Sequence, residues 1–184
     1  MQPSDVLDFW FKQPPKNWFR KDAAFDAAVR ERFGATIDVA VGGGLRAWDD
    51  AGATGTLARI LVLDQFTRNG WRDTPASFAG DAQALAAAQA LVDSGGDELL
   101  TPQQRAFAWM PFEHAEDLAM QQRAVALFTQ LAAHHDGFTD TLDYAQRHRA
   151  VIERFGRFPH RNAILGRTST PDEAAFLTEP GSRF

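Results

Sequence analysis

The sequence predicts an all-α fold, an array of packed antiparallel helices, and three observations support this fold class. Apolar residues recur every three to four positions through most of the chain, which is typical of amphipathic helices. Two segments carry complete signals for the start of a helix. No segment alternates apolar and polar residues for long enough to form a convincing strand.

The composition is that of an ordinary soluble domain, with 45% apolar and 23% charged residues. Loops are short apart from 42–55 and 69–79, so we expect a single α-helical domain over residues 1–184. The absence of cysteine excludes disulfides, thiolate nucleophiles and cysteine-bound metal clusters.

Charge and hydropathy exclude two kinds of partner. The formal net charge of −5 argues against broad affinity for nucleic acid, which requires many cations to neutralise phosphates. No apolar run reaches the roughly 20 residues of a membrane span, and the amino terminus carries acids where a signal peptide carries bases. We therefore expect a cytoplasmic protein that binds neither nucleic acid nor membrane.

The amino-terminal quarter predicts an aromatic cluster followed by a long helix. The cluster consists of Trp10, Phe11, Trp18 and Phe19. Core packing is the expected role of these rings, and lining of a ligand groove is the alternative. A helix is predicted over 21–41, because apolar residues recur there at every fourth position; these are Phe25, Val29, Phe33, Ile37 and Val41. The glycines at 42–44 end it.

The middle of the chain predicts two more helices. The stretch "TLARILVLDQFTRN", residues 56–69, is apolar nearly all round and is expected to form a buried helix. Residues 80–94 predict a helix that begins with Asp81 as its cap and ends at Gly95 and Gly96.

Two helix starts are marked by a threonine cap, a proline at the first helical position and Gln or Glu at the third. They begin at Thr101 and Thr170. The first opens a helical region over 102–134, which Pro111 is expected to kink or divide into two helices meeting near "MPFEHAED". A further helix is predicted over 138–157 and ends at Gly156 and Pro159.

The buried middle helix contains the first candidate site. Asp64 shares a helix face with apolar residues, and Arg68 follows it by one helical turn. An acid–base pair is therefore expected at the end of the apolar face. One interpretation is an internal ion pair that fixes how two helices meet. The other is that Asp64 orients Arg68 and Asn69 toward a ligand.

A second candidate is His114, which has Glu113, Glu116 and Asp117 around it. A neighbouring carboxylate raises the basicity of an imidazole, so His114 could act as a general base, or it could be a hydrogen-bonded structural histidine. The spacing matches neither Glu-x-x-His nor His-Glu-x-x-His, so we expect no metal.

The third candidate is an arginine-rich segment near the carboxyl end. Residues 147–167 contain six arginines and a single acid, Glu153. The donors that we expect at one sharp turn are Arg157, His160, Arg161 and Asn162, and we expect His148 to face inward from the preceding helix. Either these arginines join an internal polar network, or they form a receptor for a carboxylate or phosphate.

With these residues assembled, the sequence resembles the bacterial family catalogued as domain of unknown function 924. The motifs that carry the resemblance are "VLDFWF", "WFRKDAAFD", "LARILVLDQFTRN", "FAWMPFEHAEDL", "HRAVIERFGRFPHRNAILGRTST" and "DEAAFL". The resemblance implies a helical array similar to tetratricopeptide-repeat proteins, and it brings no established reaction. Ala115 stands where the resemblance implies a helix-capping serine. The candidate positions that match the family's signatures are Asp64, Gln65, Arg68, Asn69, His114, Glu116, Arg157, His160, Arg161 and Asn162.

Three functions remain open from the sequence. The leading hypothesis is a concave, arginine- and histidine-rich site that binds an anionic small molecule or an acidic peptide, with Arg68, Arg157 and Arg161 in contact with it. The second is a hydrolase or transferase acting on a phosphoryl or acyl group, with His114, His160 or Glu116 as the catalytic candidates. The third is a protein-interaction module that needs no small ligand. No cofactor is expected in any of them.

Overall fold

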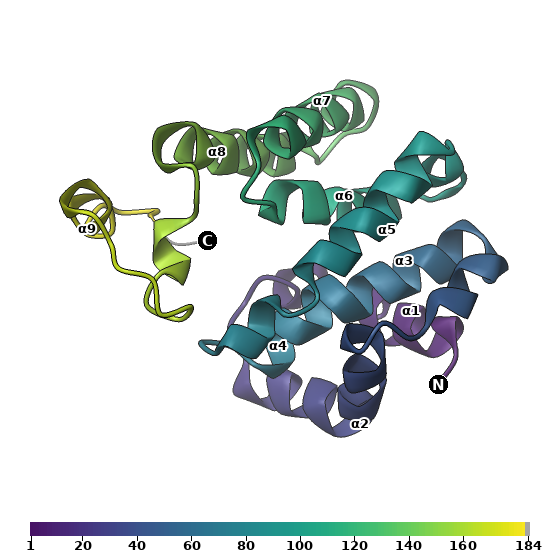
Figure 1. Ribbon diagram of the computed structural model, residues 1–184. Coiled ribbons are helices and arrows are strands. Elements are labelled where there is room, and N and C mark those ends of the chain that lie inside the picture. Colours follow the sequence, from purple (N-terminus) through teal and green to yellow (C-terminus); the bar gives the residue numbers. More distant parts are fainter. Residues whose placement is uncertain (183–184) are drawn as a thin grey trace. The chain divides into compact units, whose positions relative to one another are not determined.

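The structure is a computed structural model that describes residues 1–182, and for Lys16 only the backbone. It is all helical, as predicted, with no strand among the described residues (Figure 1). The α-helices are α1 (Pro3–Phe11), α2 (Ala23–Val41), α3 (Ala53–Leu61), α4 (Thr67–Gly70), α5 (Asp81–Asp93), α6 (Pro102–His114), α7 (Leu118–His134), α8 (Thr139–Phe155) and α9 (Pro171–Phe176). A π-helical segment, η3 (Val62–Phe66), joins α3 to α4.

Six short 3₁₀ or π segments complete the described elements. Besides η3 they are η1 (Pro15–Asn17), η2 (Arg46–Ala51), η4 (Pro75–Phe78), η5 (Gly96–Leu99) and η6 (Pro159–Arg161). No helix in the described range is long and apolar enough to cross a membrane.

The described residues group into two compact units. Unit 1 comprises Met1–Arg72 and Ala76–Pro111, and unit 2 comprises Asp73–Pro75 and the chain from Phe112 onward. The division falls within helix α6, directly after Pro111, so no linker-like composition marks it in the sequence.

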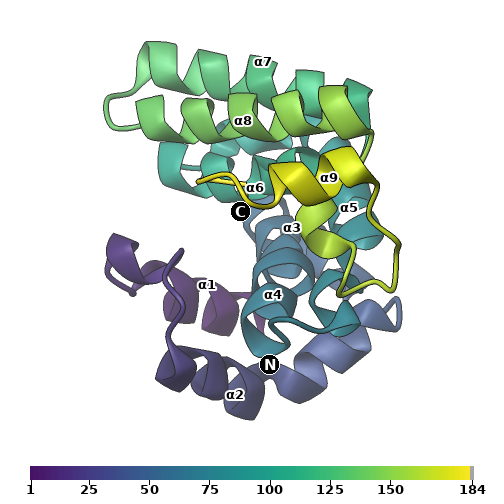
Figure 2. The same cartoon turned by 90° about the vertical axis from the view of Figure 1, so that its left-hand side faces the viewer.

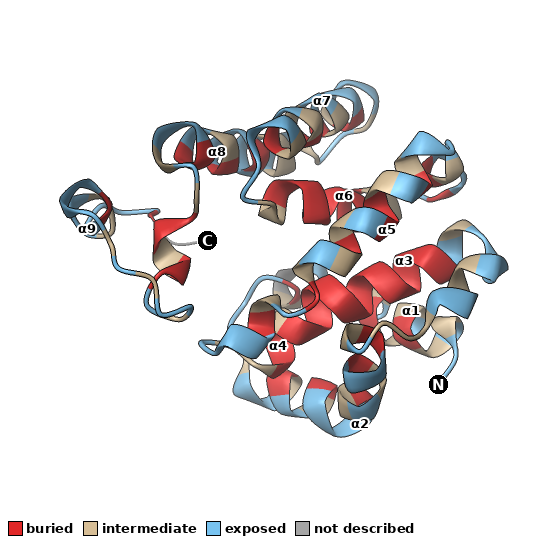
Figure 3. Cartoon of the chain, in the orientation of Figure 1, coloured by how far each residue is buried: buried red, intermediate tan, exposed pale blue. Residues whose placement is uncertain are grey.

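The centre of unit 1 is the continuous helical run α3–η3–α4, which is buried along nearly its whole length (Figure 3). It packs against α1, α2 and α5. The predicted buried helix is therefore confirmed, but its π segment was not foreseen. Widening of the helix at η3 changes the backbone pairing, and the Thr67 hydroxyl donates to the carbonyl oxygens of Leu63 (2.8 Å) and Asp64 (3.1 Å).

Aromatic rings from separate helices fill the rest of this core. Trp10 is fully buried, and its carbonyl oxygen accepts a hydrogen bond of 2.9 Å from the indole of Trp18. Phe33 of α2 contacts Phe66 with ring centroids 4.7 Å apart. The aromatic cluster therefore packs in the core, although Phe19 at its edge is 70% exposed. Helix α2 buries Val29, Phe33 and Ile37 of its predicted ridge and ends at Val41, as expected.

Asp81 does not cap helix α5, which corrects the prediction for this helix. The cap position is Gly80, and Asp81 lies in the first turn, where its carboxylate binds Arg68. A Cβ atom at Gly80 would lie 2.1 Å from the carbonyl oxygen of Leu63. Only glycine allows α5 to begin so close to the π segment.

The helical region 102–134 forms two helices that meet within "MPFEHAED", as predicted, but Pro111 does not divide them. Helix α6 continues through it to His114, and the break falls at 115–117, where the carboxylate of Asp117 caps α7. The side-chain amide of the fully buried Gln121 donates to the carbonyl oxygens of Glu113 (2.6 Å) and Ala115 (2.8 Å). This amide satisfies carbonyls that the end of α6 leaves without helical donors.

Unit 2 is built on the hairpin of α7 and α8, which lie side by side in both views (Figure 2). Gly156, with φ of 69°, ends α8 in the left-handed conformation that favours glycine. After this turn, Phe158 packs with Val151 and Ile152 of α8. The predicted capping box at Thr170 and Glu173 is present at the start of α9.

Candidate functional site

The candidate residues lie in two groups, one in each unit. Unit 1 contains Asp64, Gln65, Arg68 and Asn69. Unit 2 contains His114, Glu116, His148, Arg157, His160, Arg161 and Asn162. Each group has its own set of internal partners.

In unit 1, Arg68 holds two carboxylates. Its Nη1 lies 2.8 Å from Asp64 Oδ1 and 2.7 Å from Asp81 Oδ1, and its Nη2 donates to Asp81 Oδ2 at 3.0 Å. Burial works against the charge of the guanidinium, but the two carboxylates outweigh this effect and raise the pKa of Arg68 above its ordinary value. The sequence predicted the Asp64–Arg68 pair; Asp81 comes from a different helix and was missed.

The other unit 1 candidates also have partners inside the unit. Gln65 donates to Asp64 Oδ2 at 2.6 Å and approaches the sulfur of Met110 at 3.3 Å. Asn69 donates to Asp26 Oδ1 at 3.2 Å, and Arg72 forms two hydrogen bonds with the same carboxylate. These contacts tie η3 and α4 to α2 and α6.

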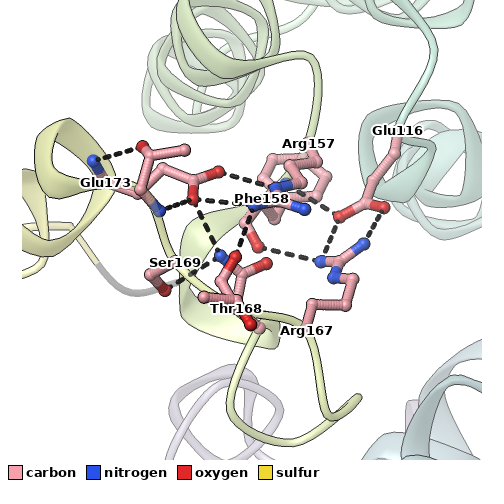
Figure 4. A network of polar contacts seen from close by, with 9 residues as sticks. Glu116, Arg157, Phe158, Arg167, Thr168, Ser169 and Glu173 are labelled. Atoms are coloured by element: carbon pink, nitrogen blue, oxygen red, sulfur yellow. Dashed lines mark hydrogen bonds and ion pairs between the residues drawn. The ribbon is translucent and has the colours of Figure 1, made fainter.

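In unit 2, the carboxylate of Glu173 is the centre of a polar network (Figure 4). Arg157 donates to it through Nε (2.6 Å) and Nη2 (2.8 Å), and Asn162 Nδ2 (3.2 Å) and the Thr170 amide (2.8 Å) also donate. The Arg157 guanidinium is the main reason why the pKa of Glu173 falls to about 2. Burial of the carboxyl acts in the opposite direction but is outweighed.

A second carboxylate, Glu116, organises the neighbouring side of this network. It accepts two hydrogen bonds from Arg167, at 2.6 and 2.9 Å, and one from the amide of Phe158 at 2.8 Å. Partial burial opposes its charge, but these donors outweigh it and hold the pKa of the Glu116 carboxyl below its usual range. Glu116 thus serves as an acceptor for the segment 157–167.

Two histidines of unit 2, His148 and His160, contact the ring of Phe158. His148 and His160 lie with ring centroids 5.5 and 5.6 Å from it, and the Arg161 guanidinium carbon lies 4.5 Å from its centroid. His148 Nδ1 lies 2.8 Å from Glu113 Oε1, and both side chains are buried. The predicted inward orientation of His148 is confirmed.

His114 and Arg161 are brought together by a backbone contact. Arg161 Nη2 donates to the carbonyl oxygen of His114 at 3.0 Å, and the His114 ring lies 6.2 Å from that of His148. His114 is partly exposed. Throughout the described chain, no group of three or more His, Asp or Glu side chains is placed to hold a metal ion.

Unit 1 also has two surface depressions, one on each side of the carboxyl half of α2, that sequence reasoning missed. One has a volume of about 280 Å³ and is lined by Met1, Ala35, Thr36, Val39 and Leu45. The other has a volume of about 180 Å³ and is lined by Ile37, Asp38, Val41, Trp71, Ala76 and Ala79. Their residues come from distant parts of the chain, so no local pattern reveals them.

The larger depression exposes apolar side chains. Met1 is 49% and Val39 is 52% exposed, and the third apolar wall is Leu45, whose φ of 62° lies in the left-handed region that leucine rarely adopts. We call these lining residues the α2 apolar surface.

Comparison with known proteins finds a matching family model and a similar solved structure. The model of a family described as "Bacterial protein of unknown function (DUF924)" matches residues 6–181. A solved structure of ATU0120, a protein of unknown function from Agrobacterium tumefaciens, is 42% identical, with 96% of each chain covered and a TM-score of 0.87. Among curated proteins, none matches this chain.

Proposed function

Because the chain belongs to the DUF924 family of bacterial proteins, for which no function is established, we propose its function from its surface: it is a protein-binding module that contacts a partner through the α2 apolar surface. The observation that carries the proposal is the apolar lining of the larger depression, formed by the exposed Met1 and Val39 and the partly exposed Leu45. An exposed apolar patch with a polar surround is typical of protein contact sites.

The polar groups support protein contact over a receptor for a small anion. The guanidinium of Arg68 is bonded to Asp64 and Asp81, and that of Arg157 is bonded to Glu173. An arginine that is already held by an internal carboxylate has less attraction to offer an anionic ligand. This arrangement matches the internal network that the sequence left open as an alternative.

Peptide display tests the proposal. A random peptide library is selected on the wild-type protein and counter-selected on Val39→Glu, which places a charge in the α2 apolar surface. Selected peptides are expected to bind wild type at least ~10-fold more tightly than Val39→Glu, because a buried unpaired charge opposes apolar contact. Leu99→Glu is the control, since Leu99 is 82% exposed and lies elsewhere in unit 1.

Two results would contradict the proposal. The first is a set of peptides that bind wild type and both variants equally. The second is a concentration-dependent dimer of wild type, seen by analytical ultracentrifugation and lost in Val39→Glu, which would assign the face to a second copy of the chain.

A second candidate, the anion site or general base of unit 2, is favoured by the buried Glu113–His148 pair beside Arg161. A carboxylate bonded to an imidazole is the arrangement that general-base catalysis uses. Thermal shift with inorganic phosphate and citrate at constant ionic strength tests for the anion site. Saturable stabilisation that is lost in Arg161→Leu would support it, and no shift up to 50-fold excess over the protein would argue against it.

Hydrolysis of p-nitrophenyl acetate and p-nitrophenyl phosphate tests the catalytic form of this candidate. Turnover that is lost in His148→Gln but kept in His134→Gln would support it, because His148 carries the imidazole bonded to Glu113, whereas His134 is an exposed histidine on α7 with its ring bonded to the Gln130 carbonyl. Equal turnover in both variants would contradict it.

A further inference from the structure

The smaller depression beside α2 combines an aromatic wall with a carboxylate. Trp71 contributes the aromatic surface, Asp38 the carboxylate, and Ile37, Val41 and two alanines the apolar walls. Its volume of about 180 Å³ is below the ~300–1,000 Å³ that whole ligands occupy, so its size fits a single long side chain.

Asp38 gives this depression a negative charge that no ion pair within the described part of the chain, residues 1–182, neutralises. Asp38 is exposed, and its carboxylate forms no hydrogen bond or ion pair with any described residue. No arginine or lysine lines the depression. This distinguishes Asp38 from the carboxylates of Asp64, Asp81 and Glu173, all of which hold a guanidinium.

The carboxyl end of helix α2 adds to the negative potential at this depression. Ile37, Asp38 and Val41 belong to its last turns, where the helix dipole places partial negative charge. The carbonyl oxygen of Val41 accepts a hydrogen bond of 2.8 Å from the Gln83 side chain, which holds this end of the helix in place. A cation in the depression would therefore meet a carboxylate, a helix carboxyl end and an aromatic side chain, each of which stabilises positive charge.

We infer that this depression, lined by Trp71 and Asp38, binds the cationic side chain of a lysine or arginine on the partner protein. The aliphatic stem would lie against Ile37 and Val41, and the charged head would pair with Asp38, as long basic side chains do at partly apolar surfaces. A purely apolar side chain is the competing occupant, and it would leave the carboxylate without a partner.

This inference rests on the proposed function and adds the chemistry of the partner. The two depressions lie on either side of the same half of α2, and Ala35 and Val39 belong to the apolar one. A partner segment that crosses α2 would place an apolar side chain on one side and a basic one on the other. Charge complementarity argues against a second copy of this chain as the occupant, because its formal net charge is −5.

Small analogues of the two side chains test the inference without a partner protein. The indole N–H signal of Trp71 is assigned by its loss in Trp71→Phe and followed by NMR during titration with n-butylammonium, n-butylguanidinium and neutral n-butanol. Saturable shifts with the two cations are expected, with dissociation constants of roughly 1–30 mM for ligands of five to eight heavy atoms.

Matched variants identify the carboxylate responsible. Asp38→Asn is expected to weaken binding of both cations by about fivefold or more, the loss of one partly exposed charge pair. Glu31→Gln removes the same charge from an exposed position two turns earlier on α2 and is expected to change binding by less than about twofold. Equal shifts with n-butanol, or equal effects of the two variants, would overturn the inference.

Failure of the inference and failure of the proposed function give different results. If the cation titrations fail but peptides selected by display still depend on Val39, the partner contact stands and only its basic anchor is wrong. If the cations bind but no Val39-dependent peptide is selected, the depression is a cation site without the proposed partner.

Discussion

Arg157 and Glu173 form a two-pronged ion pair, with Nε and Nη2 of the guanidinium 2.6 and 2.8 Å from the two carboxylate oxygens. The pair joins the turn after α8 to the first turn of α9, sixteen residues further along the chain. Arg157 also donates to the carbonyl oxygen of Thr168 at 2.9 Å. The segment between the two helices is thereby fastened at both ends.

The Glu173 carboxylate makes the stability of unit 2 dependent on pH. Its pKa is about 2 in the folded protein against an ordinary value of 4.5, so between these values the unfolded chain binds more protons. Stability from this group is present above pH 4.5 and is lost as pH falls toward 2. Glu173→Gln should therefore be less stable than wild type at pH 7 and lose less on acidification, as measured by thermal unfolding from pH 7 to pH 2.5. Parallel curves for the two proteins would contradict this.

Removal of the Arg68 guanidinium should destabilise unit 1 strongly. Asp64 is fully buried and depends on Arg68, so Arg68→Leu leaves a buried charge without its cation, at a cost of about 3–5 kcal/mol. Urea unfolding measures the loss. Lys12→Met is the control, because the Lys12–Asp8 pair is more than half exposed on both sides and should contribute less than about 1 kcal/mol. Similar losses in both variants would show that Asp64 does not need its partner.

Two glycine-to-alanine substitutions should change stability in opposite directions. Gly80→Ala places a Cβ 2.1 Å from the carbonyl oxygen of Leu63, so the backbone must shift, and the expected cost is at least about 1–3 kcal/mol. Gly34→Ala meets nothing within 4 Å inside helix α2 and should stabilise by roughly 0.5–1 kcal/mol. Thermal unfolding distinguishes them, and a stable Gly80→Ala protein would refute the close approach.

The buried amide of Gln121 should be needed to end helix α6. Gln121→Leu removes the donor to the carbonyls of Glu113 and Ala115, which would cost about 1–3 kcal/mol because buried acceptors lose their partner. Gln122→Leu is the matched control, since this neighbour is exposed and should change stability by less than about 0.5 kcal/mol. Hydrogen exchange of the α6 and α7 amides would localise the effect, and equal exchange in both variants would exclude the capping role.

Much of the fold could be predicted because its signals are local. The threonine caps at 101 and 170, the apolar ridge of α2 and the stop at Gly156 each depend on residues within one or two turns. The meeting of two helices near residues 110–117 was predicted correctly, but the dividing role given to Pro111 and the cap given to Asp81 were wrong for a tertiary reason. The break in 102–134 depends on Gln121 and Asp117, and the start of α5 depends on the approach of Gly80 to Leu63.

The polar sites were predictable only within single helices. The Asp64–Arg68 pair follows from spacing of one turn, whereas Asp81 and Glu173 reach their arginines from elements that no pattern connects. Residues 147–167 therefore have an excess of positive charge in the sequence, because the acidic partners Glu116 and Glu173 lie outside this segment. The depression at Trp71 and Asp38 draws residues from α2, from the position after α4, and from η4 and the position after it, so no local sequence pattern predicts it.

Leu45 occupies a backbone conformation that glycine would adopt without a steric penalty of about 1–2 kcal/mol. If the turn after α2 were only a connection between helices, glycine would be the least costly residue there, and three glycines directly precede it. Leucine at this position makes the turn less favourable than glycine would, but it places an apolar side chain in the α2 apolar surface. Under the proposed function, Leu45 supplies an apolar wall for the partner at a cost to the stability of the turn, so Leu45→Gly is expected to stabilise the fold and weaken peptide binding.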